Sequence, residues 1–394
     1  MQRWNKNIPE GTRDIIFDEA QLHESIERSL AEIYRKNGFM QVMTPAIEYY
    51  DVFDGESRYI EQADMYKMSD MSGRLLVLRA DNTMPIARMV ATKLRSASFP
   101  QKIFYSQNVY RANSNYTGRR NETLQSGVEI IGGGLKCDLV CITTALEALK
   151  SMGVNFKIEI GHVGFFNGII GAMNLSAEEE EMIRSFVNSK NSVSLKLMKS
   201  TPELEIIRRI PLLFGGSEVL EEAGQLAAGN DKAAEALAYV RTLYDILTES
   251  GYGDSIMIDL GIVGEMEYYT GVVFRGYMEG AGEPVLGGGR YDNLLKNFDF
   301  DMPATGFAIN VSLAADALRG TQQKAKPADY LIHFTPALFP KAESFRKSLE
   351  ARGIPAEYSC FEEIEGTVAF AKEAGISYVA EVDADGVKIT EVTI

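Results

Sequence analysis

The chain has 394 residues, of which 45% are hydrophobic, and a formal net charge of −15; this length can bury a large core and predicts two or three domains. No run of about 18 apolar residues is present for a membrane-spanning helix, and the first residues lack the apolar stretch of a secretory signal, so we expect a cytoplasmic protein. The acidic balance disfavours tRNA or other RNA as the main ligand, because phosphate binding depends on lysine and arginine.

The N-terminal part is predicted to form one long helix and then a set of strands. Apolar residues recur at helical spacing through 18–37, with Asp18 as a candidate N-cap and Gly38 as the stop. Extended segments rich in Val, Ile, Phe and Tyr follow at Met40–Thr44, Leu75–Leu78, Lys102–Val109 and Gly127–Ile131. Strands joined by short turns favour an antiparallel sheet.

The middle of the chain changes to helical sequence over about 175–250, which indicates a helical insertion. The acidic run Glu178–Glu181 after Ser176 is predicted to be a solvated first helical turn, where carboxylates meet the positive end of the helix. Strand-like sequence resumes at Ser255–Leu260 and Gly271–Gly276, and a last helical stretch covers Asn310–Arg319.

A polar segment at 321–327 reads as a linker between a domain spanning 1–320 and a small α/β domain spanning 328–394. The expected elements of the small domain are a strand at Tyr330–Phe334, a helix at Pro340–Arg352, a second strand, a helix at Thr367–Ala374 and a strand at Tyr378–Val382.

Three cysteines, Cys137, Cys141 and Cys360, leave one unpaired in any disulfide scheme. The first two are separated by four positions in an apolar stretch, which is helical spacing. We interpret all three cysteines as core thiols. Because the chain has only three histidines, we expect no metal site.

Two segments carry most of the functional information: Gly-Gly-Gly-Arg-Tyr-Asp at 287–292, and Glu-Tyr-Tyr-Thr-Gly-Val-Val-Phe at 267–274. Each places tyrosine hydroxyls beside backbone that glycine allows a ligand to approach. Taken alone, the triple glycine could be a tight connection between two strands. Together, the two segments resemble the histidine-specific signatures of the histidyl-tRNA synthetase family.

This resemblance covers roughly Ile8–Leu318. Pro9–Asp14 resembles the opening of that family, and Gly38-Phe39 through Thr44-Pro45 and Glu48 resemble its first, dimer-forming class II motif. The resemblance implies an α+β fold, in which an antiparallel sheet of the class II synthetase type is flanked by helices, and it implies a homodimer formed through that core.

The positions that match the family's amino-acid pocket are Asp81, Thr83, Gln125, Glu129, Tyr268, Tyr269 and Tyr291. Gln125 and Glu129 are evenly spaced on a predicted strand, so both can face one pocket and meet a cationic or donor-rich ligand. The alternative is a pair of exposed sheet residues. Asp81 stands where the family has glutamate, so we expect its contact with an ammonium group to be shorter, water-bridged or lost.

The adenylation machinery departs from the family pattern. Arg111 matches an anion-binding arginine, but Asn113 replaces an adenine-contacting glutamate, Gly264 replaces an arginine and has Glu265 beside it, and Leu313 stands at a third arginine position. Clamping a triphosphate requires such cations. Arg119 and Arg120 could still meet an anion, although a solvated turn is the favoured interpretation.

Three functions remain open: an active histidine–tRNA ligase, a ligand-sensing regulatory subunit, and a scaffold with a vestigial pocket. The retained pocket and the lost cations are similar to the regulatory-subunit family of ATP phosphoribosyltransferase. That resemblance implies no catalysis by this chain and no cofactor. It also implies a short-form catalytic subunit as partner, and histidine as the effector of feedback inhibition.

Overall fold

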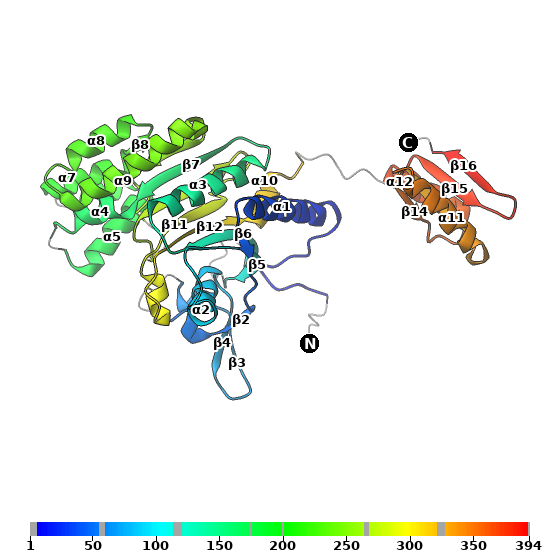
Figure 1. The fold of residues 1–394 in the computed structure, drawn as a ribbon, viewed down its shortest axis with the longest axis horizontal. Coiled ribbons are helices and arrows are strands. Elements are labelled where there is room, and N and C mark those ends of the chain that lie inside the picture. Colours follow the sequence, from blue (N-terminus) through cyan, green and yellow to red (C-terminus); the bar gives the residue numbers. More distant parts are fainter. Residues whose placement is uncertain are drawn as a thin grey trace. The chain divides into compact units, whose positions relative to one another are not determined.

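The structure of the chain, a computed structural model, describes residues 6–54, 60–112, 120–173, 175–198, 201–263, 268–320 and 328–392. It divides into two units, Met1–Arg319 and Gly320–Ile394 (Figure 1). Within the described ranges, no helix is long and apolar enough to cross a membrane.

A nine-stranded sheet, counted over the described residues, organises the first unit. In order across the sheet, the strands are β1 (Met40–Gln41), β5 (Gln101–Tyr110), β6 (Glu122–Ile131), β12 (Ala304–Asn310), β11 (Leu286–Arg290), β10 (Val272–Met278), β7 (Phe156–His162), β9 (Ile256–Asp259) and β8 (Phe214–Gly215). Neighbours are antiparallel except for β1 with β5 and β7 with β9, which are parallel. The expectation of an antiparallel sheet is therefore right for the centre and wrong near both edges.

The helices α1 (Phe17–Lys36), α3 (Leu135–Lys150) and α10 (Val311–Ala317) pack on one face of this sheet. Their apolar sides pack on the strands in the largest core cluster, to which β5 and β6 contribute Phe104, Val128 and Ile130. The helix α1 begins at Phe17 after Ile16, which makes no side-chain cap, so the N-cap prediction for Asp18 is wrong. Asp18 lies instead in the first turn, where its charge still favours the helix. Gly38 follows the helix with a φ of +80°, as its predicted role as the stop requires.

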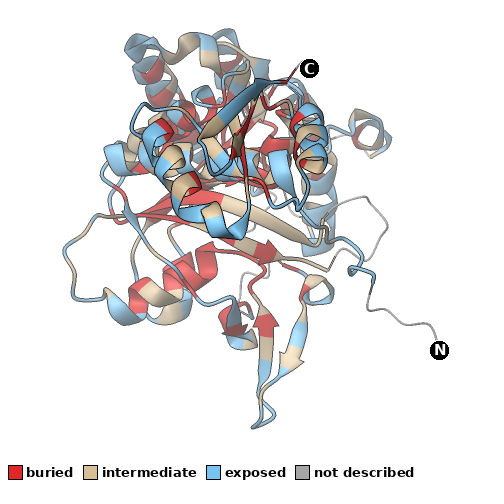
Figure 2. Ribbon diagram, turned by 90° about the vertical axis from the view of Figure 1, so that its right-hand side faces the viewer, coloured by how far each residue is buried: buried red, intermediate tan, exposed pale blue. Residues whose placement is uncertain are grey.

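The opposite face of the sheet is covered by α2 (Thr83–Lys93) and a small sheet of β2 (Ile47–Tyr49), β4 (Leu75–Leu78) and β3 (Lys67–Ser69). The helix α2 is buried along most of its length, and a second apolar cluster forms beneath it. Buried residues gather in the strands, whereas the outer helices are largely exposed (Figure 2). This face carries the candidate site.

The predicted helical insertion contains α5 (Ala177–Asn188), α6 (Ser192–Leu197), α7 (Pro202–Arg209), α8 (Glu218–Leu226) and α9 (Asp231–Leu247), and α4 (Val163–Ile170) precedes it. Its own apolar cluster also includes Ile258 and Leu260 beside the sheet edge. Ser176 and Glu179 form a capping box at the start of α5, which confirms the interpretation of the acidic run as a first helical turn.

The second unit contains a four-stranded sheet in the order β14 (Ala356–Tyr358), β13 (Tyr330–Phe334), β15 (Tyr378–Val382) and β16 (Val387–Glu391), with helices α11 (Phe339–Glu350) and α12 (Ile364–Ala374). The bounds predicted for β13 and β15 are confirmed, whereas β16 was not predicted. Cys360 is exposed in this unit, so its interpretation as a core thiol is wrong; Cys141 is buried and Cys137 is intermediate. The predicted linker at 321–327 lies outside the described residues.

Candidate functional site

The site begins with a strip of glycines on two neighbouring strands, β11 and β12, that leads to Glu129 of β6. Gly287 and Gly289 of β11 point to the α2 side of the sheet, Gly289 pairs with Gly306 of β12, and Gly306 pairs with Glu129 of β6. These residues lie inside strands, so the alternative of a tight connection at the triple glycine is wrong. The resulting floor has almost no side chains, and we call this cavity the trough.

The glycines are required because neighbouring groups occupy the space of a Cβ atom. A Cβ on Gly306 would lie 1.8 Å from Glu129 Oε2, and one on Gly289 would lie 2.8 Å from the ring of Tyr269. On the opposite face, a Cβ on Gly288 would lie 2.5 Å from the ring of Phe274. The triple glycine thus allows the polar side chains of the trough and the apolar side chains of the core to pack directly on the backbone.

Glu129 is the central polar group and is 2% exposed. Thr83 Oγ1 donates to its Oε1 at 3.0 Å, and the Tyr291 hydroxyl donates to its Oε2. Burial raises the pKa of Glu129 to about 8, an effect that the two hydroxyl donors reduce and the nearby Asp81 carboxyl increases. The trough therefore contains a carboxyl group that a cationic ligand would stabilise in its ionised form.

Three tyrosines form the wall beside Glu129. The ring centroids of Tyr268 and Tyr269 are 4.7 Å apart, and those of Tyr268 and Tyr291 are 5.5 Å apart in an edge-to-face arrangement. The residue before Tyr291, Arg290, forms two 2.9 Å hydrogen bonds with Asp138 of α3 and so fixes this end of β11. Because side chains alternate along a strand, Arg290 faces α3 and Tyr291 faces the trough on the opposite side of the sheet.

A second acidic group lies where β4 leads into α2. Asp81 is buried, and its Oδ1 accepts from the Met84 amide at 3.0 Å. Burial raises the pKa of Asp81, and the charge of Arg111 opposes that rise. Arg111 itself donates from Nε to the Ala80 carbonyl at 3.0 Å.

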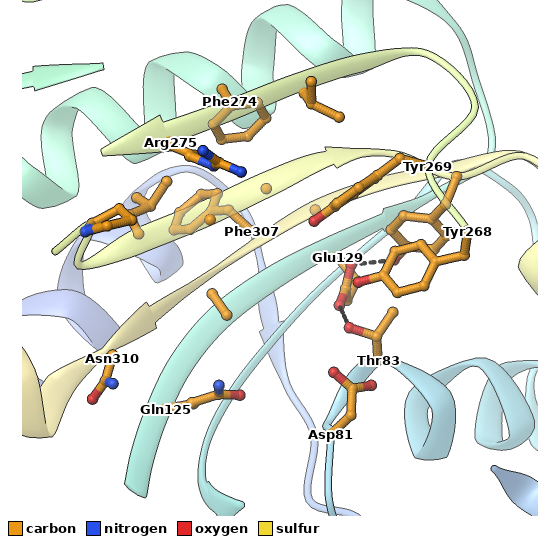
Figure 3. A pocket seen from close by; sticks show the side chains of 18 of the residues that line it. Asp81, Thr83, Gln125, Glu129, Tyr268, Tyr269, Phe274, Arg275, Phe307 and Asn310 are labelled. Atoms are coloured by element: carbon orange, nitrogen blue, oxygen red, sulfur yellow. Dashed lines mark hydrogen bonds between the residues drawn. The ribbon is translucent and has the colours of Figure 1, made fainter. Parts of the chain in front are cut away.

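The trough that these groups line has a volume of about 280 Å³. Its lining includes every residue that the sequence predicted for the amino-acid pocket, together with Arg111 (Figure 3). Those residues are Asp81, Thr83, Gln125, Glu129, Tyr268, Tyr269 and Tyr291. Gln125 accepts a 3.3 Å hydrogen bond from Asn82, so it is positioned in the trough rather than on an open surface.

Sequence reasoning missed Arg275 and Asn310, which also line the trough. Alternation along β10 could have found Arg275, because it lies two residues after Val273 and so faces the same side. Asn310 was placed only at the start of the last helix; it caps α10 by accepting from the Leu313 amide at 3.0 Å. Its position beside Gln125 comes from strand register, which the sequence does not reveal.

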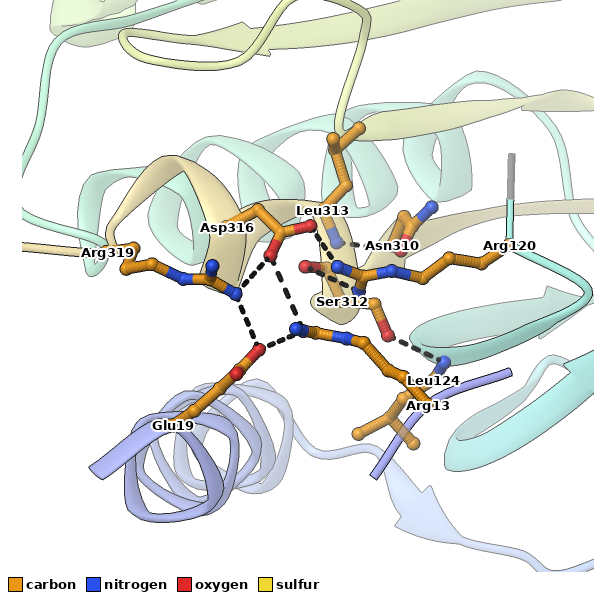
Figure 4. Close-up of polar contacts among 9 residues, drawn as sticks. All are labelled: Arg13, Glu19, Arg120, Leu124, Asn310, Ser312, Leu313, Asp316 and Arg319. Atoms are coloured by element: carbon orange, nitrogen blue, oxygen red, sulfur yellow. Dashed lines mark hydrogen bonds and ion pairs between the residues drawn. The ribbon is translucent and has the colours of Figure 1, made fainter. Parts of the chain in front are cut away.

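The lost adenylation positions are only partly described. Leu313 packs against the large core cluster, and Arg120 is ion-paired with Asp316 of α10 rather than solvated in a turn (Figure 4). Arg13 and Arg319 also contact Asp316. Asn113, Arg119 and 264–267 lie outside the described residues.

The chemistry of the trough suits a small ligand that is both cationic and polar. Two buried carboxyl groups can meet positive charge, hydroxyl and amide groups can fix orientation, and aromatic rings can pack on a flat group. Searching only the described residues finds no cluster of His, Cys, Asp and Glu that could hold a metal ion.

Known proteins match both the sequence and the fold. The Histidyl-tRNA synthetase family model matches residues 11–313. An ATP phosphoribosyltransferase regulatory subunit of Clostridium acetobutylicum is 42% identical, with 96% of this chain and 95% of that protein covered. One from Clostridium botulinum is 40% identical, with coverages of 96% and 92%.

Solved structures give the same result. The structure of an ATP phosphoribosyltransferase regulatory subunit/histidyl-tRNA synthetase from Bacillus halodurans has a TM-score of 0.85 and is 30% identical, covering 97% of this chain and 100% of that one. A histidyl-tRNA synthetase from Nostoc has a TM-score of 0.81 at 19% identity, covering 98% and 94%, and shows the shared fold. The chain therefore belongs to the family of ATP phosphoribosyltransferase regulatory subunits, built on the class II histidyl-tRNA synthetase fold.

Proposed function

We propose that this chain binds histidine in the trough and thereby regulates a separate catalytic chain. The partner is the short-form ATP phosphoribosyltransferase, which transfers the phosphoribosyl group to ATP in the first step of histidine biosynthesis. This chain supports that activity, confers feedback inhibition by histidine, and carries out no catalysis itself. Two copies of this chain form a homodimer through the class II core. This homodimer assembles with the catalytic partner in the cytoplasm.

One observation carries the proposal: the amino-acid side of the trough is complete, whereas a cation site for ATP activation is not. Glu129, Tyr291 and Thr83 form a buried hydrogen-bonded group at one end. Leu313, at a position where synthetases of this type carry an arginine, is partly buried and packs against the apolar core. A site that holds the amino acid without clamping a triphosphate suits sensing better than ligation.

Two properties of the trough support histidine as the ligand. Its imidazole and ammonium groups supply N–H donors and positive charge for the carboxyl groups of Glu129 and Asp81. Its flat ring can pack against Tyr268 and Tyr269, whose rings lie 4.7 Å apart and are tilted by 54°. Apolar amino acids of similar size would offer these carboxyl groups no donor and no positive charge, and a missing hydrogen bond to a charged group costs about 1.5–3 kcal/mol.

Calorimetric titration of the purified chain tests this proposal. Histidine is expected to bind with micromolar or tighter affinity, and Glu129→Ala and Tyr269→Ala are expected to weaken binding by at least tenfold. Glu122→Ala is the matched control, because Glu122 lies on the same strand but faces the helix side. The absence of heat and of a thermal shift at millimolar histidine would contradict the proposal. Histidine-dependent exchange of pyrophosphate into ATP would instead support an active ligase.

A further inference from the structure

Two amide side chains form a second polar end of the trough. Asn310 pairs with Gln125 at one end of the β12–β6 ladder, and Gly306 pairs with Glu129 further along it (Figure 3). Four residues of extended strand place roughly 13 Å between the Cα atoms of Gln125 and Glu129. Between Gly306 and Asn310, the residue of β12 that lines the trough is Ala308, which has only a methyl group. No long side chain of β12 therefore separates the amide end from the acidic end.

Hydrogen bonds within the chain already occupy both amide oxygens. The side chain of Asn310 caps α10, so its Oδ1 accepts from the Leu313 amide at 3.0 Å. Asn82 is fully buried, and its Nδ2 donates to Gln125 Oε1 at 3.3 Å. In the part of the chain that the structure describes, neither Asn310 Nδ2 nor Gln125 Nε2 has a hydrogen-bond partner. Both residues line the trough, so this end of the trough offers a ligand donors rather than acceptors.

The carboxyl group of Asp81 lies beside this donor end. Asp81 lines the trough and directly precedes Asn82, the residue that is bonded to Gln125. An α-amino acid carries its ammonium and carboxylate groups on one carbon atom, so it needs an acceptor and a donor side by side. Asp81 supplies the acceptor, and the two amide groups supply two N–H donors each. The carboxyl group of Glu129 then remains for the side chain of the ligand.

We propose that the amide groups of Gln125 and Asn310 together bind the carboxylate of the amino-acid ligand, and that Asn310 makes the trough selective for ligands with this group. The assignment rests on the proposed function, because it concerns the ligand of the same trough. Hydrogen bonds from an N–H group to an ionised carboxylate are stronger than those between neutral groups. An amine that has no carboxylate forgoes these bonds and binds only through the acidic groups.

The test compares the affinities of the full chain for histidine and for L-histidinol, which keeps the imidazole and ammonium groups but has a hydroxymethyl group in place of the carboxylate. Calorimetric titration is expected to show that the parent binds histidine roughly 10- to 100-fold more tightly, because histidinol loses hydrogen bonds to a charged group. Asn310→Ser and Asn310→Asp both keep an oxygen that can accept from the Leu313 amide, so both preserve the cap of α10.

The two substitutions change the donor end in different ways. Asn310→Ser has no NH2 group and is expected to lower the ratio of histidine affinity to histidinol affinity about tenfold. Asn310→Asp places a negative charge where the ligand carboxylate binds, so histidine is expected to lose its advantage over histidinol completely. Histidinol should bind this variant at least as tightly as it binds the parent, because the new charge attracts its ammonium group.

Asn191→Asp is the matched control. Asn191 caps α6 in the same way, by accepting from the Ser194 amide at 3.1 Å, but it is exposed in the helical insertion. The affinity ratio of this variant is expected to stay at the parent value. If Asn310→Ser kept the parent ratio, or if the ratio collapsed only in Arg111→Gln, the assignment would be overturned while histidine binding stayed established. If the parent chain bound neither compound, the proposed function would fail and this assignment with it.

Discussion

Glu129 shows how a single buried group ties ligand binding to stability. The folded-state pKa of about 8 lies above the ordinary value of 4.5, so between these pH values the folded state holds more protons than the unfolded state. The free energy of unfolding should therefore fall as the pH rises from about 4.5 to about 8. Glu129→Gln removes this contribution, so its melting temperature relative to the parent is expected to rise steadily over that range.

Thermal unfolding of both chains at pH 5, 6, 7 and 8 measures this difference. A constant offset would reflect only changed hydrogen bonds to Thr83 and Tyr291, whereas the slope reports the titration of Glu129. Parallel curves for parent and variant would show that Glu129 does not carry the raised pKa.

Two glycines of the floor allow a matched comparison of backbone packing. Gly306→Ala is expected to destabilise the chain by about 1–3 kcal/mol, because the new Cβ would overlap Glu129 and the Val128 carbonyl. Gly287→Ala adds the same methyl group to the same floor in open space and is expected to change stability little. Denaturant unfolding of both variants tests this, and equal losses would mean that the floor is not packed as described.

The residue types of the site could be predicted from the sequence, but some of their neighbours could not. Gln125 and Glu129 follow from alternation on one strand, and the tyrosines follow from the two signatures. Arg275 and Asn310 face the same cavity only because of register across β10, β11, β12 and β6, which depends on contacts distant in sequence. The partners of Arg120 likewise come from α10, almost 200 positions later.

At the scale of elements, α3 and β11 are held together by a buried ion pair. The side chains of Arg290 and Asp138 are 9% and 0% exposed, and the Arg290 guanidinium also donates to the Gly133 and Gly134 carbonyls. Arg290→Gln leaves the Asp138 charge buried without its partner and is expected to cost about 3–5 kcal/mol. Arg319→Gln is the control: Arg319 is 58% exposed, and losing its ion pairs with Glu19 and Asp316 should cost under about 1 kcal/mol. Equal losses in urea unfolding would contradict this account.

Element prediction succeeded where local sequence decides the structure. Apolar periodicity predicts α1, the capping box predicts the start of α5, and apolar runs predict β13 and β15. Each of these signals lies within a few neighbouring residues. The parallel pairing of β1 with β5 and of β7 with β9 depends on the path of the long chain segments that connect these strands. The composition of the strands alone does not determine it. The edge strand β16 is largely exposed and lacks the apolar run that marks a buried strand.

At the scale of the whole molecule, regulation requires more than ligand binding. If histidine lowers the activity of a separate catalytic chain, it must bind with different affinity to two states of the assembly. A coupling free energy of about 1–3 kcal/mol would shift the balance between those states by roughly 5- to 150-fold. Feedback inhibition therefore does not require the complex to dissociate.

The most direct test is the ATP phosphoribosyltransferase activity of the complex reconstituted with its catalytic chain, measured across a histidine series. With each complex normalised to its own rate without histidine, Gln125→Ala is expected to raise the histidine concentration for half-inhibition at least tenfold over the parent. Glu122→Ala, on the other face of the same strand, should match the parent. If the Gln125→Ala complex remained as sensitive to histidine as the parent, the effector site would lie outside the trough and the central claim would be contradicted.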